Sequence, residues 1–209
     1  MLTVVGCQRS VVLNYWITWL YKGLLLSVLV LMLADCDNSQ PPTRPQDLCS
    51  VFKEKPGWYR QAKKSEARWG TSVPVMMAIM YQESCFRQDV RPPRRWFWII
   101  PLPRKSSAYG YAQAQDAVWG EYLKEAGGWF SSRKNFGDAI DFIGWYNHKS
   151  HRINKVSLQQ ADQLYLNYHE GWRGFRKQHW KSKKWLQKTA KKIQSQAAKY
   201  QVQLGKCHL

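Results

Sequence analysis

The sequence predicts an all-α domain, and three observations support this fold class. From Asp47 onward, apolar residues recur at helical spacing. Typical helix-start and helix-stop residues separate these stretches. The sequence contains no alternating strand pattern of useful length and no internal repeat. The length of 209 residues fits one domain with short appendages.

Each expected helix is delimited by local signals. The third one starts at Thr71-Ser72, a capping pair followed by Pro74 in the first turn. Gly127-Gly128 ends the fourth, and Ser157 is the expected cap of the sixth. The seven expected helices cover residues 47–54, 57–69, 72–86, 112–126, 136–149, 157–169 and 180–203.

Residues 91–107 form an insert that is rich in proline and tryptophan. Its four prolines are incompatible with a continuous helix. A loop of this length inside a compact domain is usually functional or disordered. The run Trp-Phe-Trp-Ile-Ile at residues 96–100 argues against disorder. We therefore expect the insert to pack against another part of the domain or to cover it.

The composition is basic and aromatic. Lys and Arg total 32 against 14 Asp and Glu, which gives a formal net charge of +18. Such an excess indicates partners such as nucleic acid, anionic lipid or an anionic wall polymer. The 12 Trp, 11 Tyr and 7 Phe are typical of proteins that bind flat amphipathic ligands such as sugars, but they also fit a small, densely packed core.

The N-terminal region predicts export. Residues 23–34 form an apolar run that Lys22 precedes. This run is too short to span a bilayer, which takes about 20 residues, but it suits the hydrophobic part of a secretory signal. The alternative is a membrane anchor over residues 11–34, which Lys22 would interrupt. We expect residues 1–35 to be a signal peptide outside the fold.

A lipid anchor is expected at the end of this signal. Leu33-Ala34-Asp35-Cys36 resembles the lipobox of bacterial lipoproteins, although Asp35 replaces the usual small residue. The resemblance implies that Cys36 is lipidated and holds the protein at a membrane. In that family an Asp after the Cys, here Asp37, implies retention at the inner membrane. We therefore expect the periplasmic side of the cell envelope, with the inner membrane favoured over the outer.

The mature chain is expected to begin with a tether. Residues 36–46 are polar and Pro-rich, which predicts a flexible segment, and residues 47–209 are expected to form the domain. An exported domain meets anionic lipid and wall polymers and does not meet nucleic acid. In an oxidising compartment Cys49 and Cys207 would tie the first helix to the last. Cys85 is expected to be buried and free, and this odd thiol leaves the pairing open.

One carboxylate falls on the apolar side of a helix. Val75, Met76, Ile79 and Met80 recur at helical spacing, and Glu83 continues this stripe. Desolvation there raises the pKa of a carboxyl group and keeps it protonated near neutral pH, as a general acid requires. The alternative is a half-exposed Glu at a helix end with no role.

Four segments resemble the lytic transglycosylases, in that family's order. Gln82-Glu83-Ser84-Cys85-Phe86 resembles the Glu-Ser-x-Phe motif, and Trp145-Tyr146-Asn147 resembles Ala-Tyr-Asn. Residues 107–113 resemble the Gly-Ala-x-Gly-Leu-Met-Gln segment, and residues 165–171 lie where the family has a late aromatic. The resemblance covers about residues 50–180 and implies a lysozyme-like helical fold. The departures are Ser107, Tyr111-Ala112 and His148-Lys149.

The resemblance also implies a chemistry. Glu83 would be the catalytic acid and base that cuts the MurNAc–GlcNAc bond of peptidoglycan and closes a 1,6-anhydro ring on MurNAc. Neither a cofactor nor a metal is implied, and the sequence shows no metal-ligand spacing. The residues expected to contact the glycan are Ser84, Tyr109, Gly110, Gln113, Tyr146, Asn147 and Tyr168.

The same residues allow other interpretations. Simple core packing also explains Tyr146 and Tyr168, and helix capping explains Asn147. His169 and Glu170 form either a second acid–base pair or a polar helix end. Competing functions are a muramidase, a non-catalytic peptidoglycan-binding lipoprotein of an envelope complex, and a membrane-active protein that uses the basic residues 176–206.

Overall fold

The structure is a computed structural model that describes residues 40–94 and 96–209. The expected signal peptide, the lipidation site Cys36 and the beginning of the tether lie outside the described residues. Pro41–Leu209 is a compact unit with a core of its own. In the described part of the chain, no helix is long and apolar enough to cross a membrane.

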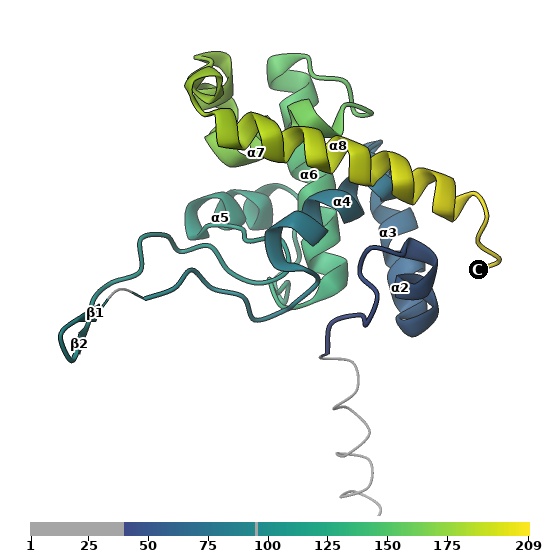
Figure 1. Ribbon diagram of the computed structural model, residues 1–209, viewed down its shortest axis with the longest axis horizontal. Coiled ribbons are helices and arrows are strands. Elements are labelled where there is room, and N and C mark those ends of the chain that lie inside the picture. Colours follow the sequence, from purple (N-terminus) through teal and green to yellow (C-terminus); the bar gives the residue numbers. More distant parts are fainter. Residues whose placement is uncertain (1–39, 95) are drawn as a thin grey trace, which may run out of the picture. The chain divides into compact units, whose positions relative to one another are not determined.

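The described residues are mostly helical, which confirms the predicted fold class (Figure 1). The 3-10 helix η2 (His179–Ser182) precedes the last helix. The α-helices are α2 (Leu48–Glu54), α3 (Pro56–Trp69), α4 (Val73–Ser84), α5 (Asp116–Glu125), α6 (Phe136–Asn154), α7 (Ala161–Arg176) and α8 (Lys184–Leu204).

Most helices begin close to where the local signals place them, with three exceptions. Helix α5 begins four residues later than expected, at Asp116, because residues 109–114 form a tight turn with an isolated bridge between Tyr109 and Ala114. Helix α7 begins at Ala161 and not after Ser157. Helix α8 begins at Lys184 and not at residue 180, because η2 occupies His179–Ser182. Helix α6 is longer than expected and ends at Asn154.

Helix α4 lies at the centre of the domain. Every residue from Val73 to Met80 is buried, so the helix is apolar on all sides and not only along one stripe. Its N-terminus follows the Ser72 cap, and the Glu66 carboxylate accepts a hydrogen bond from the Val73 N–H at 3.0 Å. Helices α3, α6, α7 and α8 pack around it.

Helix α8 lies along α4 and α7 (Figure 1). One of its faces is buried against them. The other faces carry its polar and basic residues. The buried face consists of Leu186, Ala190, Ile193, Ala197 and Tyr200 at helical spacing.

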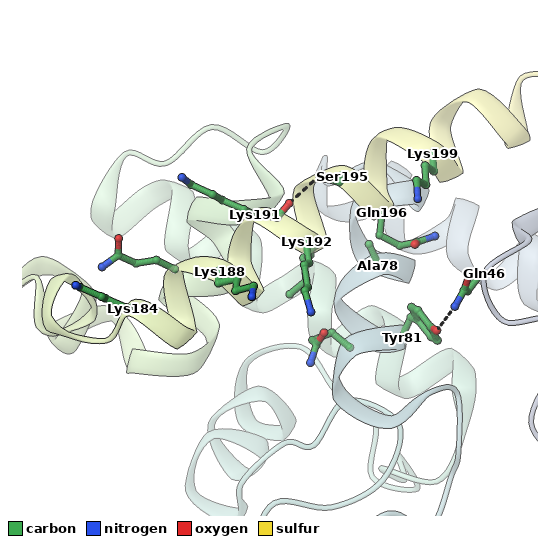
Figure 2. Close-up of a pocket in the computed structure, with 13 residues that line it drawn as sticks. Gln46, Ala78, Tyr81, Lys184, Lys188, Lys191, Lys192, Ser195, Gln196 and Lys199 are labelled. Atoms are coloured by element: carbon green, nitrogen blue, oxygen red, sulfur yellow. Dashed lines mark hydrogen bonds between the residues drawn. The ribbon is translucent and has the colours of Figure 1, made fainter.

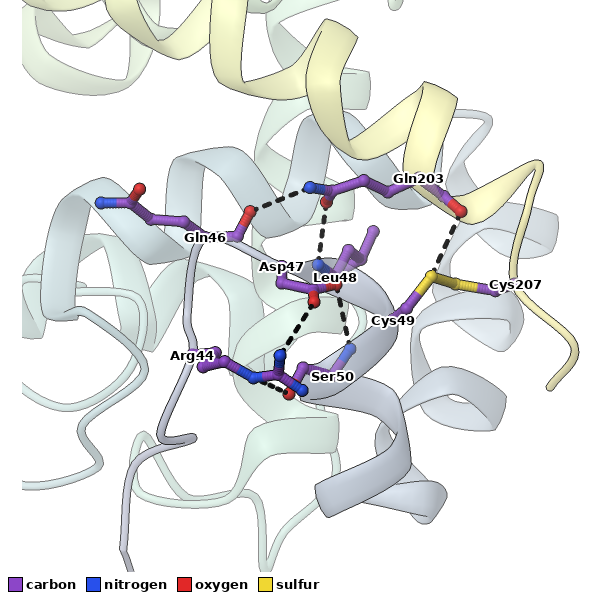
Figure 3. The surroundings of a disulfide bond; sticks show 8 residues. All are labelled: Arg44, Gln46, Asp47, Leu48, Cys49, Ser50, Gln203 and Cys207. Atoms are coloured by element: carbon purple, nitrogen blue, oxygen red, sulfur yellow. Dashed lines mark hydrogen bonds and ion pairs between the residues drawn. A yellow bond between two sulfur atoms is a disulfide. The ribbon is translucent and has the colours of Figure 1, made fainter.

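The two ends of the unit are fastened together (Figure 3). Cys49 and Cys207, the two cysteines expected to pair, form a disulfide with a Cα–Cα distance of 5.7 Å. Beside it, the Leu48 N–H donates to Gln203 Oε1 at 2.9 Å, and Gln203 Nε2 donates to the Gln46 carbonyl at 3.2 Å.

The tether expected over residues 36–46 needs a correction from Pro41 onward. Pro42 is buried, and both the N–H and the hydroxyl of Thr43 donate to the Glu54 carboxylate. The Tyr200 hydroxyl donates to the Pro45 carbonyl. These contacts hold residues 41–46 against the domain although their composition is polar and rich in proline.

The tip of the insert neither covers the domain nor packs against it, so the expectation was wrong for residues 96–100. The ends of the insert, in contrast, contact the domain through Arg91 and Ser107. The tip is a small antiparallel hairpin of β1 (Trp96–Phe97) and β2 (Ile100–Pro101), which extends away from the helices (Figure 1). Trp98, at the turn, is 87% exposed. Strands of two residues form no face that is large enough to bury these side chains.

Candidate active site

Glu83 occupies the last turn of α4, where the chain leaves the core. Cys85 and Phe86 adopt left-handed backbone conformations with φ of 51° and 60° and end the helix two residues earlier than expected. Phe86 is buried between Trp58 and Tyr81, at ring distances of 5.9 and 5.7 Å. This anchor fixes the turn that follows Glu83.

The two residues after Glu83 differ from expectation. Ser84 is buried, and its hydroxyl donates to the Met80 carbonyl at 3.2 Å, so it faces the interior and not a ligand. Cys85 is free as expected but exposed, because the left-handed position after the helix points its side chain outward.

The environment of Glu83 favours its acid form. Its side chain keeps partial access to solvent, yet the surrounding atoms bury the carboxyl group. Burial raises the pKa of Glu83 to about 7, while a hydrogen bond from the Tyr165 hydroxyl opposes this rise. A carboxyl group of this kind releases and takes up a proton near neutral pH.

Aromatic side chains of α6 and α7 lie around this carboxyl group. Burial and the nearby Glu83 raise the pKa of both Tyr165 and Tyr168 above the usual range, which keeps the two hydroxyls protonated. Tyr146 packs edge-on against Tyr168 at 4.9 Å and stacks on Trp172 at 4.7 Å. The Tyr146 hydroxyl donates to the Asn167 carbonyl at 3.0 Å, so Tyr146 belongs to the core behind Tyr168.

Tyr168 connects the carboxyl site to the turn before α5. Its hydroxyl donates to the Ala112 carbonyl at 2.5 Å. Gln113 holds the same turn, because its side-chain amide donates to the carbonyls of Val90 and Gly110, both at 2.9 Å. The turn therefore has a fixed position relative to Glu83.

The backbone conformation and the close packing at residue 110 require glycine. Its φ is +78°, and a Cβ added there would lie 2.1 Å from the Arg133 carbonyl oxygen. Next to it, Arg91 stacks on the Tyr109 ring at 4.1 Å, and Arg133 lies 5.5 Å from the same ring. Tyr109 stays partly exposed, whereas Gly110 is buried and contributes backbone shape.

Asn147 is fully buried in the middle of α6, which excludes the helix-capping interpretation. Neither atom of its side-chain amide has a hydrogen-bond partner among the described residues. Buried polar groups are normally paired. Asn147 is thus a buried polar residue whose side-chain amide forms no hydrogen bond with the described residues around it.

His169 and Glu170 do not form a second acid–base pair with Glu83. Glu170 bonds to Lys183 Nζ at 2.7 Å and to His169 Nδ1 at 3.0 Å. Burial acts to raise the pKa of Glu170, but the hydrogen bonds from Lys183 and His169 outweigh it and hold that pKa below its usual value. Glu170 is therefore a carboxylate in a structural ion pair.

Two further features of the described region concern metal binding and the position of a hollow. Within residues 40–94 and 96–209, no group of three His, Cys, Asp or Glu side chains is placed to hold a metal ion. A hollow of about 800 Å³ lies between α4 and α8, and its lining includes Gln82 but not Glu83 (Figure 2).

Comparison with protein families finds a match over most of the chain. The family described as "Transglycosylase SLT domain" matches residues 24–207. The chain belongs to the transglycosylase SLT domain family. No curated protein and no solved structure matches this SLT-domain chain. Membership indicates in general terms a lytic transglycosylase-type domain that acts on peptidoglycan.

Sequence reasoning missed one residue of this SLT domain. Tyr165, not Tyr168, donates the hydrogen bond to Glu83. Both tyrosines lie in the segment 165–171 that resembles the family, and their separation of three residues puts them on one helical face. This spacing is the feature of the sequence that could have pointed to Tyr165 as well as Tyr168. Which hydroxyl reaches Glu83 depends on how α7 packs against α4.

Proposed function

We propose that this SLT domain is a lytic transglycosylase in which Glu83 serves as both acid and base. The observation that carries the proposal is the carboxyl group of Glu83, whose pKa burial raises to about 7 and to which Tyr165 donates a hydrogen bond. A single carboxyl group in this state can first give up a proton and then take one back.

In the first step, Glu83 donates its proton to the glycosidic oxygen between MurNAc and GlcNAc. The bond between C1 of MurNAc and that oxygen breaks, and GlcNAc leaves with a 4-hydroxyl group. Electron density from the acetamido oxygen of MurNAc stabilises the positive charge at C1. The Tyr165 hydroxyl stabilises the Glu83 carboxylate that this step creates.

In the second step, the Glu83 carboxylate removes the proton of the C6 hydroxyl of the same MurNAc. The C6 oxygen forms a bond to C1 and closes the 1,6-anhydro ring, and Glu83 returns to its acid form. The protons balance without a water molecule. Glycosidases that use water generally need a second carboxylate.

The surroundings of Glu83 support this route over hydrolysis. Among the described residues, no acidic side chain contributes to the shift in the pKa of Glu83. Three other carboxylates already form ion pairs with lysine side chains. Glu170 pairs with Lys183, and both Glu121 and Glu125 pair with Lys149.

We also propose that the protein is exported and lipid-anchored through Cys36 on the periplasmic side of the inner membrane. The support is the apolar run 23–34 and the lipobox-like sequence at residues 33–36. Metabolic labelling with a fatty-acid analogue tests this, since Cys36→Ala should abolish the label.

Mass spectrometry of the soluble products from purified sacculi tests the enzymatic proposal. The wild-type protein is expected to release anhydro-muropeptides, and Glu83→Gln is expected to release none. Products with reducing ends would identify a muramidase. If the wild type binds sacculi but releases no products, the protein is a non-catalytic peptidoglycan-binding lipoprotein.

A further inference from the structure

All five lysines of α8 line the same hollow (Figure 2). The other wall of this hollow includes Ala78, Tyr81 and Gln82 of α4. From the first lysine to the last, the helix rises about 22 Å. The five are Lys184, Lys188, Lys191, Lys192 and Lys199, and we call this hollow the α8 groove.

Within the described part of the chain, no acidic residue balances the positive charge of the α8 groove. Helix α8 contains no Asp or Glu, and no residue that lines the groove is acidic. Among the described residues, no ion pair includes any of the five lysines. Lys184, Lys188 and Lys192 are four residues apart, a spacing at which like charges destabilise a helix.

The helix keeps this arrangement because its opposite face is anchored. Leu186, Ala190 and Ala197 are buried against the domain and do not line the groove, and the Cys49–Cys207 disulfide fastens the region after the helix. The lysines are therefore held as a row on a rigid support. All five are exposed, and an anion that binds between them lowers their mutual repulsion further than water and salt do.

An ordinary solvated helix face does not account for these features. Solvated faces usually mix both signs of charge. The α8 groove has one sign, and it is concave. A narrow chain with several negative charges fits a hollow with a row of ammonium groups.

The position of the groove indicates where such a chain comes from. Gln82, which lines the groove, directly precedes Glu83 on α4. In peptidoglycan, short peptides with free carboxylates branch from the MurNAc sugars of the glycan strand. The last turn of α4 therefore contributes both to the groove and to the Glu83 site, so a strand bound at Glu83 brings its carboxylates to this end of α4.

We propose that the α8 groove binds the carboxylate-bearing peptides of the glycan strand that is cut at Glu83. This inference rests on the proposed function for the position of the strand. The lysine ammonium groups bind the carboxylates. The protein then prefers peptide-bearing strands with ionised carboxylates.

Binding and cleavage of two matched polymers test the proposal. One is soluble peptide-bearing glycan, and the other is the same material after carbodiimide coupling with excess methylamine, which converts its carboxylates to neutral amides. Binding is measured with the full chain carrying Glu83→Gln, so that the polymers stay intact. Cleavage is measured with Glu83 present.

The variants change charge at matched positions. The groove variant is Lys188→Gln, Lys191→Gln and Lys192→Gln together, and a second variant replaces the same three residues with Arg. The control replaces three exposed lysines outside the groove, Lys53, Lys124 and Lys177, with Gln. Circular dichroism and thermal melts confirm that each variant is folded.

We expect the parent protein to bind the charged polymer about tenfold more tightly than the neutral one. The groove variant should lose this preference, while the Arg variant and the control should keep it. Added salt should reduce the preference of the parent. If the groove variant retains the full preference, the proposal is wrong.

Two further outcomes would point to a different ligand or a different function. If the groove variant loses binding to phosphatidylglycerol vesicles but not to the charged polymer, the groove binds lipid phosphate and the proposal is overturned. If no protein cleaves either polymer, the proposed function fails. The binding preference still decides the role of the groove in that case, because it is measured without cleavage.

Discussion

At the scale of single residues, Glu83 experiences two opposing effects. Burial favours the neutral acid, and the hydrogen bond from Tyr165 favours the carboxylate, with burial as the larger effect. The result is a pKa of about 7 in place of the ordinary 4.5. The same balance that suits proton transfer makes the folded protein sensitive to pH.

The first prediction concerns stability. Because the folded pKa of Glu83 is raised, its favourable contribution is complete below pH 4.5, falls as the pH rises toward 7, and is absent above that. Glu83→Gln should therefore gain about 1–3 kcal/mol of unfolding free energy relative to wild type above pH 7. At pH 4 the two proteins should differ little.

Chemical denaturation at pH 4, 6 and 8 measures this difference. Glu66→Gln is unsuitable as a control because Glu66 caps α4. The reference is Asp89→Asn, since Asp89 is exposed and forms no ion pair among the described residues. A difference between Glu83→Gln and wild type that shrinks with rising pH would contradict the burial of the carboxyl group.

The second prediction concerns Tyr165, which we regard as a positioning residue. Tyr165→Phe removes the hydrogen bond that lowers the pKa of Glu83, so this pKa should rise further. The alkaline limb of kcat/KM, expected near pH 7 in wild type, should move to higher pH. The value of kcat/KM at pH 6 should fall roughly tenfold because the carboxylate formed in the reaction loses a donor.

The pH profile distinguishes this role from a structural one. Tyr59→Phe on α3, whose ring packs against Phe52, is the matched control and should leave the alkaline limb in place. A Tyr165→Phe protein with an unchanged limb, or with a limb moved to lower pH, would exclude the hydrogen bond as a determinant of the acidity of Glu83.

At the scale of elements, the hairpin of the insert contrasts with the helices. Trp96, Phe97, Trp98, Ile99 and Ile100 are between 58 and 87% exposed. Their side chains add little to the stability of the folded domain, because they leave the water hardly more than in the unfolded chain. Trp145 on α6 is buried and lies in the aromatic core.

The third prediction compares two tryptophans. Trp98→Ala should change the free energy of unfolding by less than about 0.5 kcal/mol. Trp145→Ala should cost about 3–5 kcal/mol, because it opens a cavity and removes the donor to Glu125. Urea denaturation of both variants provides the comparison. A Trp98→Ala cost close to that of Trp145→Ala would show that the hairpin packs on the domain.

At the scale of the whole molecule, the disulfide links residues 158 positions apart. It joins the start of α2 to the chain after α8, next to the hydrogen bonds of Gln203 with Leu48 and Gln46. Cross-links that close long loops restrict the unfolded chain most. This closure also holds α8, and hence the α8 groove, against the domain.

The fourth prediction concerns this cross-link. Replacing Cys49 and Cys207 with Ser should lower the free energy of unfolding by about 2–5 kcal/mol, seen as a lower Tm. Reduction of the wild type with dithiothreitol should have the same effect, and Cys85→Ser, which leaves the disulfide intact, should not. A wild-type Tm that is insensitive to reductant would contradict this role.

The sequence alone determined the fold class, the approximate helices and the candidate acid. Hydrophobic period and cap residues act over a few neighbouring positions, so they could be read directly at Ser72, Pro74 and the stripe before Glu83. The order of four short motifs indicated the family for the same reason. Each motif is a local pattern along the chain.

Only the tertiary structure decided which groups meet. It identified Tyr165 as the hydrogen-bond donor to Glu83, turned Ser84 inward, placed Gln113 on the carbonyls of the turn, and left the hairpin exposed. It also gathered the lysines of α8 beside α4. These outcomes depend on how α7 and α8 pack across the central helix, which is a long-range property that no local spacing contains.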